Sequence, residues 1–107
     1  MKIINDKGIS HVKGYKAIGL YCGIKKNMYK DLCLIYSTRP AVAAATFTTN
    51  LVKAAPVLVD MQHIQSDNIQ ALIINSGNAN ACTGEAGFEN AVEMAKITSA
   101  QLGIRPY

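Results

Sequence analysis

The sequence reads Asn75-Ser76-Gly77-Asn78-Ala79-Asn80-Ala81-Cys82-Thr83-Gly84-Glu85-Ala86-Gly87 between two segments of contrasting pattern. Before it lies the short apolar run Ala71-Leu72-Ile73-Ile74, which is typical of a buried strand. After it, apolar residues recur at helical spacing, at Phe88, Ala91, Val92 and Ala95. The pattern therefore predicts a strand, then a polar loop of small residues, then a helix.

This loop has two interpretations on its residues alone. Its glycines allow positive φ angles, and its asparagines supply amides that tolerate left-handed turns. The free N–H groups at the start of the following helix point back at the loop, so the loop could bind an anion or a carbonyl oxygen. Alternatively, it is a tight connector whose polar side chains satisfy its own backbone. The residues by themselves favour the connector.

The segments before residue 69 predict three further strands, preceded by an N-terminal strand or arm. Tyr15–Cys22 alternates at period two, and Leu32–Ser37 is a short apolar run, so the two predict an antiparallel hairpin around a polar, basic loop. Residues 1–13 predict an N-terminal strand or arm. Thr38-Arg39-Pro40 interrupts the pattern, and the alanine-rich segment 41–48 is interpreted as a strand because β-branched and aromatic residues accompany the alanines.

One helix is expected before the strand at 69–75 in the sequence, and another is expected after it. Pro56 suits a first helical turn, and the apolar face of the helix that follows it is expected at Val57, Leu58, Met61 and Ile64. The second helix is expected over about 85–102, with Gly103 as its C-terminal stop. Together these elements predict a single domain of the α/β (α+β) class.

Composition excludes several classes of protein. The net charge is +4, but the basic residues are spread thinly, and the densest patch, Lys25-Lys26 with Lys30 nearby, suits a solvated loop better than a nucleic-acid site. No apolar run approaches the ~20 residues that span a bilayer, and the N-terminus lacks the apolar core of a signal peptide. We therefore expect no nucleic acid, no membrane and a cytoplasmic location.

Candidate catalytic and metal-binding residues are sparse. The odd number of cysteines, three, fits neither a disulfide framework nor a zinc site, and we expect no metal. Cys82 lies near a helix start, where a thiol pKa can be lowered, but a base would have to be His11 or His63, and no local pattern places either. The glycine-rich turn lacks the Gly-Lys-Ser/Thr of a phosphate loop. A structural thiol is the preferred interpretation.

The segment from Asn75 to Gly84 resembles the signature of the ArgJ family, the glutamate N-acetyltransferases or ornithine acetyltransferases. Other segments resemble that family in the same order along the chain, from about residue 8 to 104: Gly14-Tyr15-Lys16-Ala17, Gly23-Ile24-Lys25-Lys26, Lys30-Asp31-Leu32, Phe47-Thr48-Thr49-Asn50 and Lys53-Ala54-Ala55-Pro56-Val57. The resemblance implies part of an αββα sandwich of the DmpA/ArgJ type.

The resemblance also implies an activity. Such enzymes move the acetyl group of N-acetylornithine to glutamate in arginine biosynthesis, and some acetylate glutamate from acetyl-CoA, which is then a substrate; no cofactor is implied. The precursor cuts itself at an Ala-Thr bond, and the freed threonine becomes the nucleophile. The implied partners are the remainder of the α part and the self-cleaved β chain, in an αβ hetero-oligomer.

The chain departs from the family in length. The oxyanion Thr-Gly pair and the nucleophilic threonine are expected beyond Tyr107, and Ala45-Thr46 lacks the motif of the cleavage site. Residues 1–107 are therefore interpreted as the N-terminal portion of a single larger domain, without catalytic residues of its own. The expected contribution is a loop that shapes the site, consisting of Asn75, Gly77, Asn78, Asn80, Cys82, Thr83 and Gly84.

Two alternatives remain at this point. A self-processing aminopeptidase of the DmpA group would share the fold and the self-cleavage, although the Asn/Gly signature is that of ArgJ. A non-enzymatic anion-binding module would use the same loop without any transfer chemistry.

Overall fold

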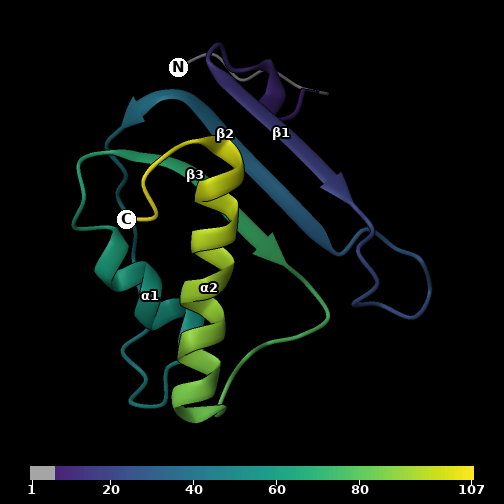
Figure 1. Cartoon of the computed structure of the whole chain (residues 1–107), viewed down its shortest axis with the longest axis vertical. Coiled ribbons are helices and arrows are strands. Elements are labelled where there is room, and N and C mark those ends of the chain that lie inside the picture. The colour runs from purple at the N-terminus through teal and green to yellow at the C-terminus, as the bar shows by residue number, and fades with distance from the viewer. Residues whose placement is uncertain (1–6) are drawn as a thin grey trace.

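The computed structural model describes residues 7–107, so the first half of the predicted N-terminal strand or arm lies outside the described residues. The elements follow in the order η1 (Ile9–His11), β1 (Tyr15–Leu20), β2 (Leu32–Ala41), α1 (Ala55–His63), β3 (Ile69–Asn75) and α2 (Gly84–Leu102). The 9–13 part of the expected arm begins with the short 3₁₀ turn η1. The predicted hairpin, the strand at 69–75 and the long final helix are all confirmed (Figure 1).

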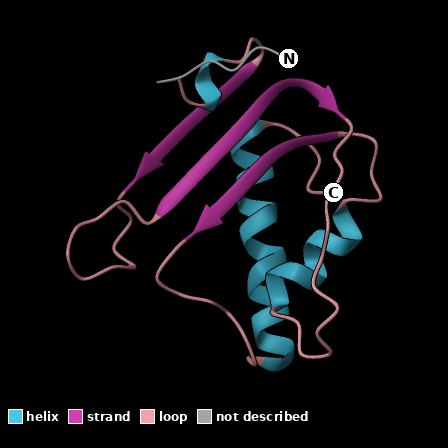
Figure 2. Ribbon diagram, turned by 180° about the vertical axis from the view of Figure 1, so that it is seen from behind, coloured by secondary structure: helices cyan, strands magenta, loops and turns pink. Residues whose placement is uncertain are grey.

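The strands form an antiparallel sheet in the order β1-β2-β3. In the hairpin Ala17 pairs with Ile35, and on the other side Ile35 pairs with Leu72. Both helices lie on the same side of this sheet, so the described residues make one β layer and one α layer (Figure 2). The architecture is the α+β class that the sequence predicts.

The expected strand over residues 41–48 is wrong, because β2 continues through Arg39-Pro40 and ends at Ala41. The register against β3 shifts between Tyr36 and Ala41, which marks a bulge there. A bulge leaves ladder positions unpaired, so a proline that has no N–H group is tolerated in the strand. Beyond Ala41 no described strand pairs with the chain, and Val42 is 82% exposed.

Helix α1 packs with a face that only partly matches the expected one, since Val57 and Ile64 are half-buried as expected. Ala55 and Val59, four residues apart, are buried, whereas Leu58 and Met61 are exposed. The backbone N–H of Ala55 donates to the carbonyl oxygen of Asn80 at 3.2 Å, and this bond ties the buried side of the helix to the Asn/Gly loop. Helix α1 is therefore anchored to the loop at its first residue.

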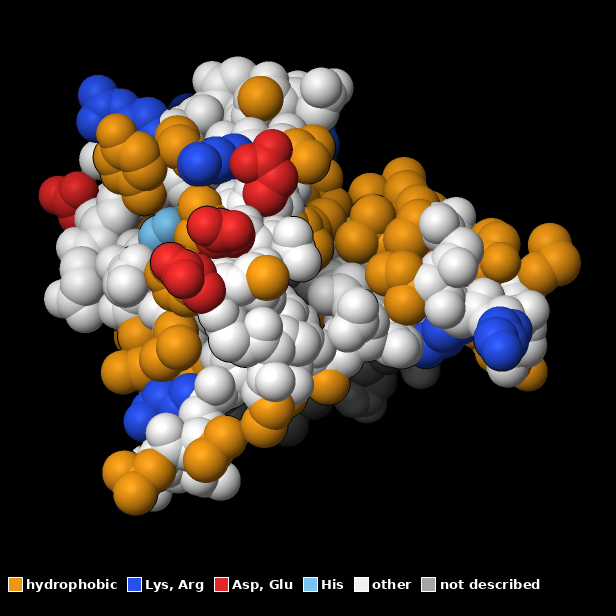
Figure 3. All heavy atoms as spheres, turned by 60° about the horizontal axis from the view of Figure 1, so that its bottom comes forward, with side chains coloured by type: hydrophobic (Ala, Val, Ile, Leu, Met, Phe, Trp, Pro, Cys, Tyr) orange, Lys and Arg blue, Asp and Glu red, His pale blue; other side chains and the backbone are white. Residues whose placement is uncertain are grey.

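Helix α2 follows its sequence pattern closely. Its periodic apolar residues are half-buried, and Glu85, Glu89, Glu93 and Lys96 are exposed. Figure 3 shows acidic side chains gathered on one part of the surface and a broad group of hydrophobic side chains on another. Gly103 ends the helix in the left-handed conformation at φ 66°, as predicted. In the described part of the chain, no helix has the length and apolarity required to cross a membrane.

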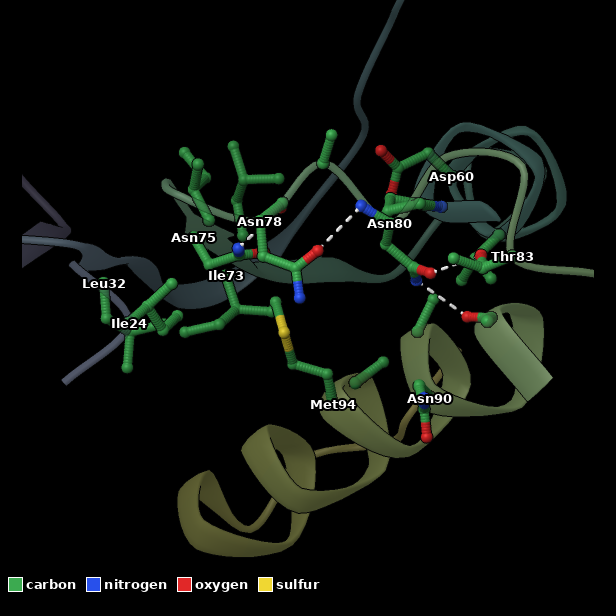
Figure 4. Close-up of a pocket in the computed structure, with 18 of the residues that line it drawn as sticks. Ile24, Leu32, Asp60, Ile73, Asn75, Asn78, Asn80, Thr83, Asn90 and Met94 are labelled. Carbon is green, nitrogen blue, oxygen red and sulfur yellow. Dashed lines mark hydrogen bonds between the residues drawn. The ribbon is translucent and has the colours of Figure 1, made fainter. Parts of the chain in front are cut away.

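The sheet face that points away from the helices is apolar and open to solvent. Ile73 points toward α2 (Figure 4), so its neighbours on β3 point to the opposite face, where Leu72 is 48% and Ile74 43% exposed. Across the sheet they align with Ile35 and Cys33 of β2. Side chains of this kind on one face of a sheet favour association with another surface.

We expect the 107-residue chain by itself to self-associate through this open face. Light scattering or size-exclusion chromatography should show species larger than a monomer, and Leu72→Lys should reduce them because it places a charge on the face. Leu51→Lys is the matched control, since Leu51 is 96% exposed but lies outside the sheet. A well-behaved monomer of the unsubstituted chain would contradict the prediction.

Candidate functional site

The Asn/Gly loop runs from the end of β3 to the start of α2, as the sequence predicts. It turns sharply, with φ angles of 98° at Gly77, 46° at Asn80, 57° at Cys82 and 64° at Gly84. Glycine and asparagine adopt such left-handed angles with little strain, whereas Cys82 does so at a cost. The positive φ angles of the backbone therefore account for glycine or asparagine at positions 77, 80 and 84.

The asparagine side chains of the loop are hydrogen-bonded within it (Figure 4). Asn75 Nδ2 donates to the carbonyl oxygen of Asn78 at 3.0 Å, and Asn78 Oδ1 accepts from the Asn80 N–H at 3.1 Å. Asn80 Nδ2 donates to the Gly87 carbonyl oxygen at 2.7 Å, and Asn80 Oδ1 accepts from Thr83 Oγ1 at 2.6 Å. Hydrogen bonds of this kind are expected of a tight connector, because they pair the polar groups of the loop with one another.

Some polar atoms of the loop are left over by this network. Among the described residues, no hydrogen bond involves Asn75 Oδ1 or Asn78 Nδ2, so one acceptor and one donor remain for another group. Both side chains line the hollow described next. The loop is thus a rigid connector that still presents two polar atoms beside a cavity.

A hollow of about 950 Å³ lies between β3, α1, α2 and this loop. Apolar side chains form much of its wall, and Ile73 and Met94 extend toward each other across it (Figure 4). Polar residues line it too, among them Asp60 and His63 of α1. Burial raises the pKa of the Asp60 carboxyl, while the nearby His63 acts in the opposite direction.

Asp31 is a functional-site candidate that sequence reasoning missed. It is 2% exposed and lies directly before β2, and both its sequence neighbour Leu32 and its hydrogen-bond partner Cys22 line the hollow. Its carboxylate accepts backbone N–H groups from the hairpin loop. An acidic residue directly between a glycine-containing loop and an apolar strand was the available signal.

The electrostatics of Asp31 follow from these bonds. Burial raises the pKa of its carboxyl, but hydrogen bonds from the backbone N–H groups of Cys22, Lys25 and Ile24 and from the Cys22 thiol outweigh that effect, and the pKa falls to about 2. The same contact with Asp31, followed by burial, raises the pKa of the Cys22 thiol. Asp31 is therefore ionised and Cys22 is a neutral thiol near neutral pH.

The structure does not assemble a nucleophile and a base from the cysteine and histidine candidates. Cys82 and His11 are exposed and His63 is half-buried, and no hydrogen bond in the described range links Cys82 to an imidazole. No group of histidine, cysteine and carboxylate side chains that could hold a metal occurs within residues 7–107. The remaining site-loop candidates, Gly77, Thr83 and Gly84, lie together in the strand-to-helix connection.

These features define an α+β chain in which a rigid Asn/Gly loop joins an antiparallel sheet to a helix beside a cavity. The chain belongs to the ArgJ family, since the model of that family matches residues 16–107.

Two relatives show how far the similarity extends. The chain is 57% identical over 106 residues to the arginine biosynthesis bifunctional protein ArgJ 1 of Clostridium acetobutylicum, covering 99% of this chain and 26% of the relative. It is 53% identical over 104 residues to the ArgJ protein of Caldanaerobacter subterraneus, covering 97% of this chain and 25% of that relative. The chain thus spans about a quarter of the length of these curated relatives.

Two solved structures share its fold. The ArgJ protein of Bacillus halodurans has a TM-score of 0.89 at 38% identity, and the ornithine acetyltransferase of Mycobacterium tuberculosis, solved in complex with ornithine, has a TM-score of 0.87 at 42% identity. Each match covers 94% of this chain and 52% of the solved chain.

Proposed function

We propose that this chain is the N-terminal portion of an enzyme that moves the acetyl group of N-acetylornithine to glutamate in arginine biosynthesis. The observation that carries the proposal is the match to the Mycobacterium tuberculosis ornithine acetyltransferase, at 42% identity over 94% of the chain. That protein was solved with ornithine bound, which is the product left when N-acetylornithine gives up its acetyl group. Relatives named as arginine biosynthesis proteins support the same pathway.

The chain's own part in this reaction is to shape the site. Its loop holds Asn75, Gly77, Asn78, Asn80, Cys82, Thr83 and Gly84 in one rigid connection, and Asn75 Oδ1 and Asn78 Nδ2 remain available to a polar substrate. The nucleophilic threonine and the oxyanion Thr-Gly pair are proposed to lie in segments beyond Tyr107. Residues 1–107 would then be one portion of a larger domain.

The proposal extends to the partners and the surroundings of the reaction. The remaining α segments and a self-cleaved β chain complete an αβ hetero-oligomer in the cytoplasm. Acetyl-CoA is the second acetyl donor to be tested, and no cofactor is proposed. The proposal is supported by the coverage of the relatives, since the chain matches 26% and 25% of their lengths.

The test compares this chain with the same chain extended by the segments that the Clostridium acetobutylicum relative carries beyond the matched region. We expect the extended enzyme to transfer acetyl from N-acetylornithine to labelled glutamate, and the 107-residue chain alone to show no turnover. Turnover by the chain alone would contradict the location of the nucleophile. An extended enzyme that folds and cleaves itself, yet transfers no acetyl group, would contradict the proposed reaction.

A further inference from the structure

The buried carboxylate of Asp31 organises the hairpin loop that joins β1 to β2. Asp31 Oδ1 accepts the N–H of Cys22 at 2.7 Å, and Asp31 Oδ2 accepts the N–H groups of Ile24 and Lys25 at 2.8 and 2.9 Å. Both carboxylate oxygens are therefore occupied by backbone donors of one turn. Hydrogen bonds to an ionised acceptor are about twice as strong as neutral ones.

The backbone of Asp31 reaches in the opposite direction, to the Asn/Gly loop. Its N–H donates to the Leu20 carbonyl oxygen at 3.0 Å, which closes the hairpin, and its own carbonyl oxygen accepts the N–H of Ser76 at 2.8 Å. Ser76 is the first residue after β3 and the second of the loop. One residue thus contacts both the turn at 22–25 and the turn at 75–78.

The two turns also touch each other directly. A Cβ atom added at Gly77 would lie 3.0 Å from Ile24 Cγ2 and 3.0 Å from Lys25 Cγ. A side chain at this position would make the Ile24 and Lys25 side chains shift by a few tenths of an ångström, and Gly77 also has a φ of 98°, which favours glycine. Cys22 and Ile24 line the same hollow as Asn75 and Asn78, so the hairpin loop contributes one wall of the cavity and the Asn/Gly loop the adjoining wall.

We propose that Asp31 is a positioning residue that holds the 22–25 turn against the 75–78 turn and thereby fixes the adjoining walls of the hollow. The consequence for substrate binding rests on the proposed function, whereas the coupling of the two turns does not. The alternative is that Asp31 only orders its own hairpin loop. If Asp31 couples the turns, its substitution alters both the 22–25 turn and the 75–78 turn. If it only orders its own loop, the substitution alters the 22–25 turn alone.

The first experiment measures amide hydrogen exchange in the 107-residue chain and its Asp31→Asn variant. The amide side chain has nearly the same shape but only one acceptor oxygen, so at least one backbone donor loses its partner. We expect exchange to become about tenfold faster at Cys22, Ile24 or Lys25 and also at Ser76, whose N–H is bonded to the Asp31 carbonyl oxygen. Asp67→Asn is the matched control, because Asp67 is exposed in a distant turn, and it should leave these amides unchanged.

A second variant tests the coupling from the other side. Gly77→Ala presses on Ile24 and Lys25, so exchange at those two amides should also become faster although Asp31 is intact. Gly103→Ala is its control, since Gly103 also has a positive φ, 66°, but an added Cβ would meet nothing within 4 Å. If each substitution alters exchange only in its own turn, the coupling is refuted.

Kinetics of the extended enzyme separate positioning from mere support of the fold. If Asp31 sets a wall of the site, Asp31→Asn raises KM for N-acetylornithine about tenfold and leaves kcat within about twofold. A purely structural role would lower the fraction of folded enzyme, and therefore the apparent kcat, with KM unchanged; that result would overturn the positioning role. Failure of the unsubstituted enzyme to transfer acetyl contradicts the proposed function instead, and the exchange measurements still decide the coupling.

Discussion

Replacing Gly87 with alanine is expected to destabilise the chain by about 3 kcal/mol, in the range of severe overpacking. Gly87 is buried in the first turn of α2, where an added Cβ would overlap Oγ1 and Cβ of Thr83 and would lie 2.6 Å from Asn80 Oδ1. Those two side chains are hydrogen-bonded to each other, and Asn80 also donates to the Gly87 carbonyl oxygen. The substitution therefore strains the network that closes the loop.

Intrinsic helix propensity would predict the opposite sign. Alanine stabilises a helix interior by about 1 kcal/mol relative to glycine, so a lower stability can only come from the clash and the displaced hydrogen bonds. Urea unfolding of the two chains, followed by circular dichroism, gives the difference in the free energy of unfolding. Equal stability, or a gain, would show that Thr83 and Asn80 move aside without cost.

Two further variants identify the cause. Gly8→Ala is the matched control, because an added Cβ there meets nothing within 4 Å and φ is an ordinary −92°, so stability should change by less than about 0.5 kcal/mol. Gly87→Ala should cost less in a Thr83→Gly background, because the nearest obstacle has been removed. If the effects of the two substitutions on the free energy of unfolding are additive, the clash with Thr83 is not the cause of the destabilisation.

The elements predictable from sequence are those with a strong periodic pattern. The hairpin, β3 and α2 show apolar spacing of period two or 3.6 bounded by glycine or polar turns, and the structure confirms them. The alanine-rich segment 41–48 lacks such a pattern. Alanine buries little area in either conformation, so the absence of a pairing partner decides its irregular path.

The path of the Asn/Gly loop between strand and helix was predictable, whereas its part in a functional site stays a prediction. The residue types of the Asn/Gly loop indicate sharp turns and self-satisfied amides, which the structure bears out at Asn75 and Asn80. The type and position of Asp31 were a signal in the sequence, but its partners could not be inferred, because they are backbone N–H groups 6 to 9 residues earlier, which nearly every residue type supplies. The burial of Ala55 and Val59 in α1 was missed because it depends on tertiary packing, which the apolar spacing of the helix does not show.

The second large effect is expected at acid pH, where Asp31 should cause a loss of stability between about pH 4 and pH 2. Its folded pKa is lowered from an ordinary 3.8 to about 2, because the hydrogen bonds from the 22–25 turn outweigh the opposing effect of burial. A depressed carboxyl pKa contributes stability that is fully present above the unfolded value and is lost as the pH falls through the folded value. The ionised form is the one that accepts the three backbone donors.

Comparison with Asp31→Asn isolates this contribution from the other carboxyls. Asp60 acts with the opposite sign, because burial raises its pKa and so favours the fold when it is protonated. Both chains contain Asp60 and the glutamates, so the difference in their free energy of unfolding reports on Asp31. The neutral Cys22 thiol, which faces the carboxyl, does not titrate in this range. The Asp31→Asn variant should have a lower free energy of unfolding at pH 6, and its difference from the unsubstituted chain should shrink steadily from pH 4 to pH 2. A difference that does not change with pH would mean that the charge of Asp31 contributes nothing to the stability of the fold.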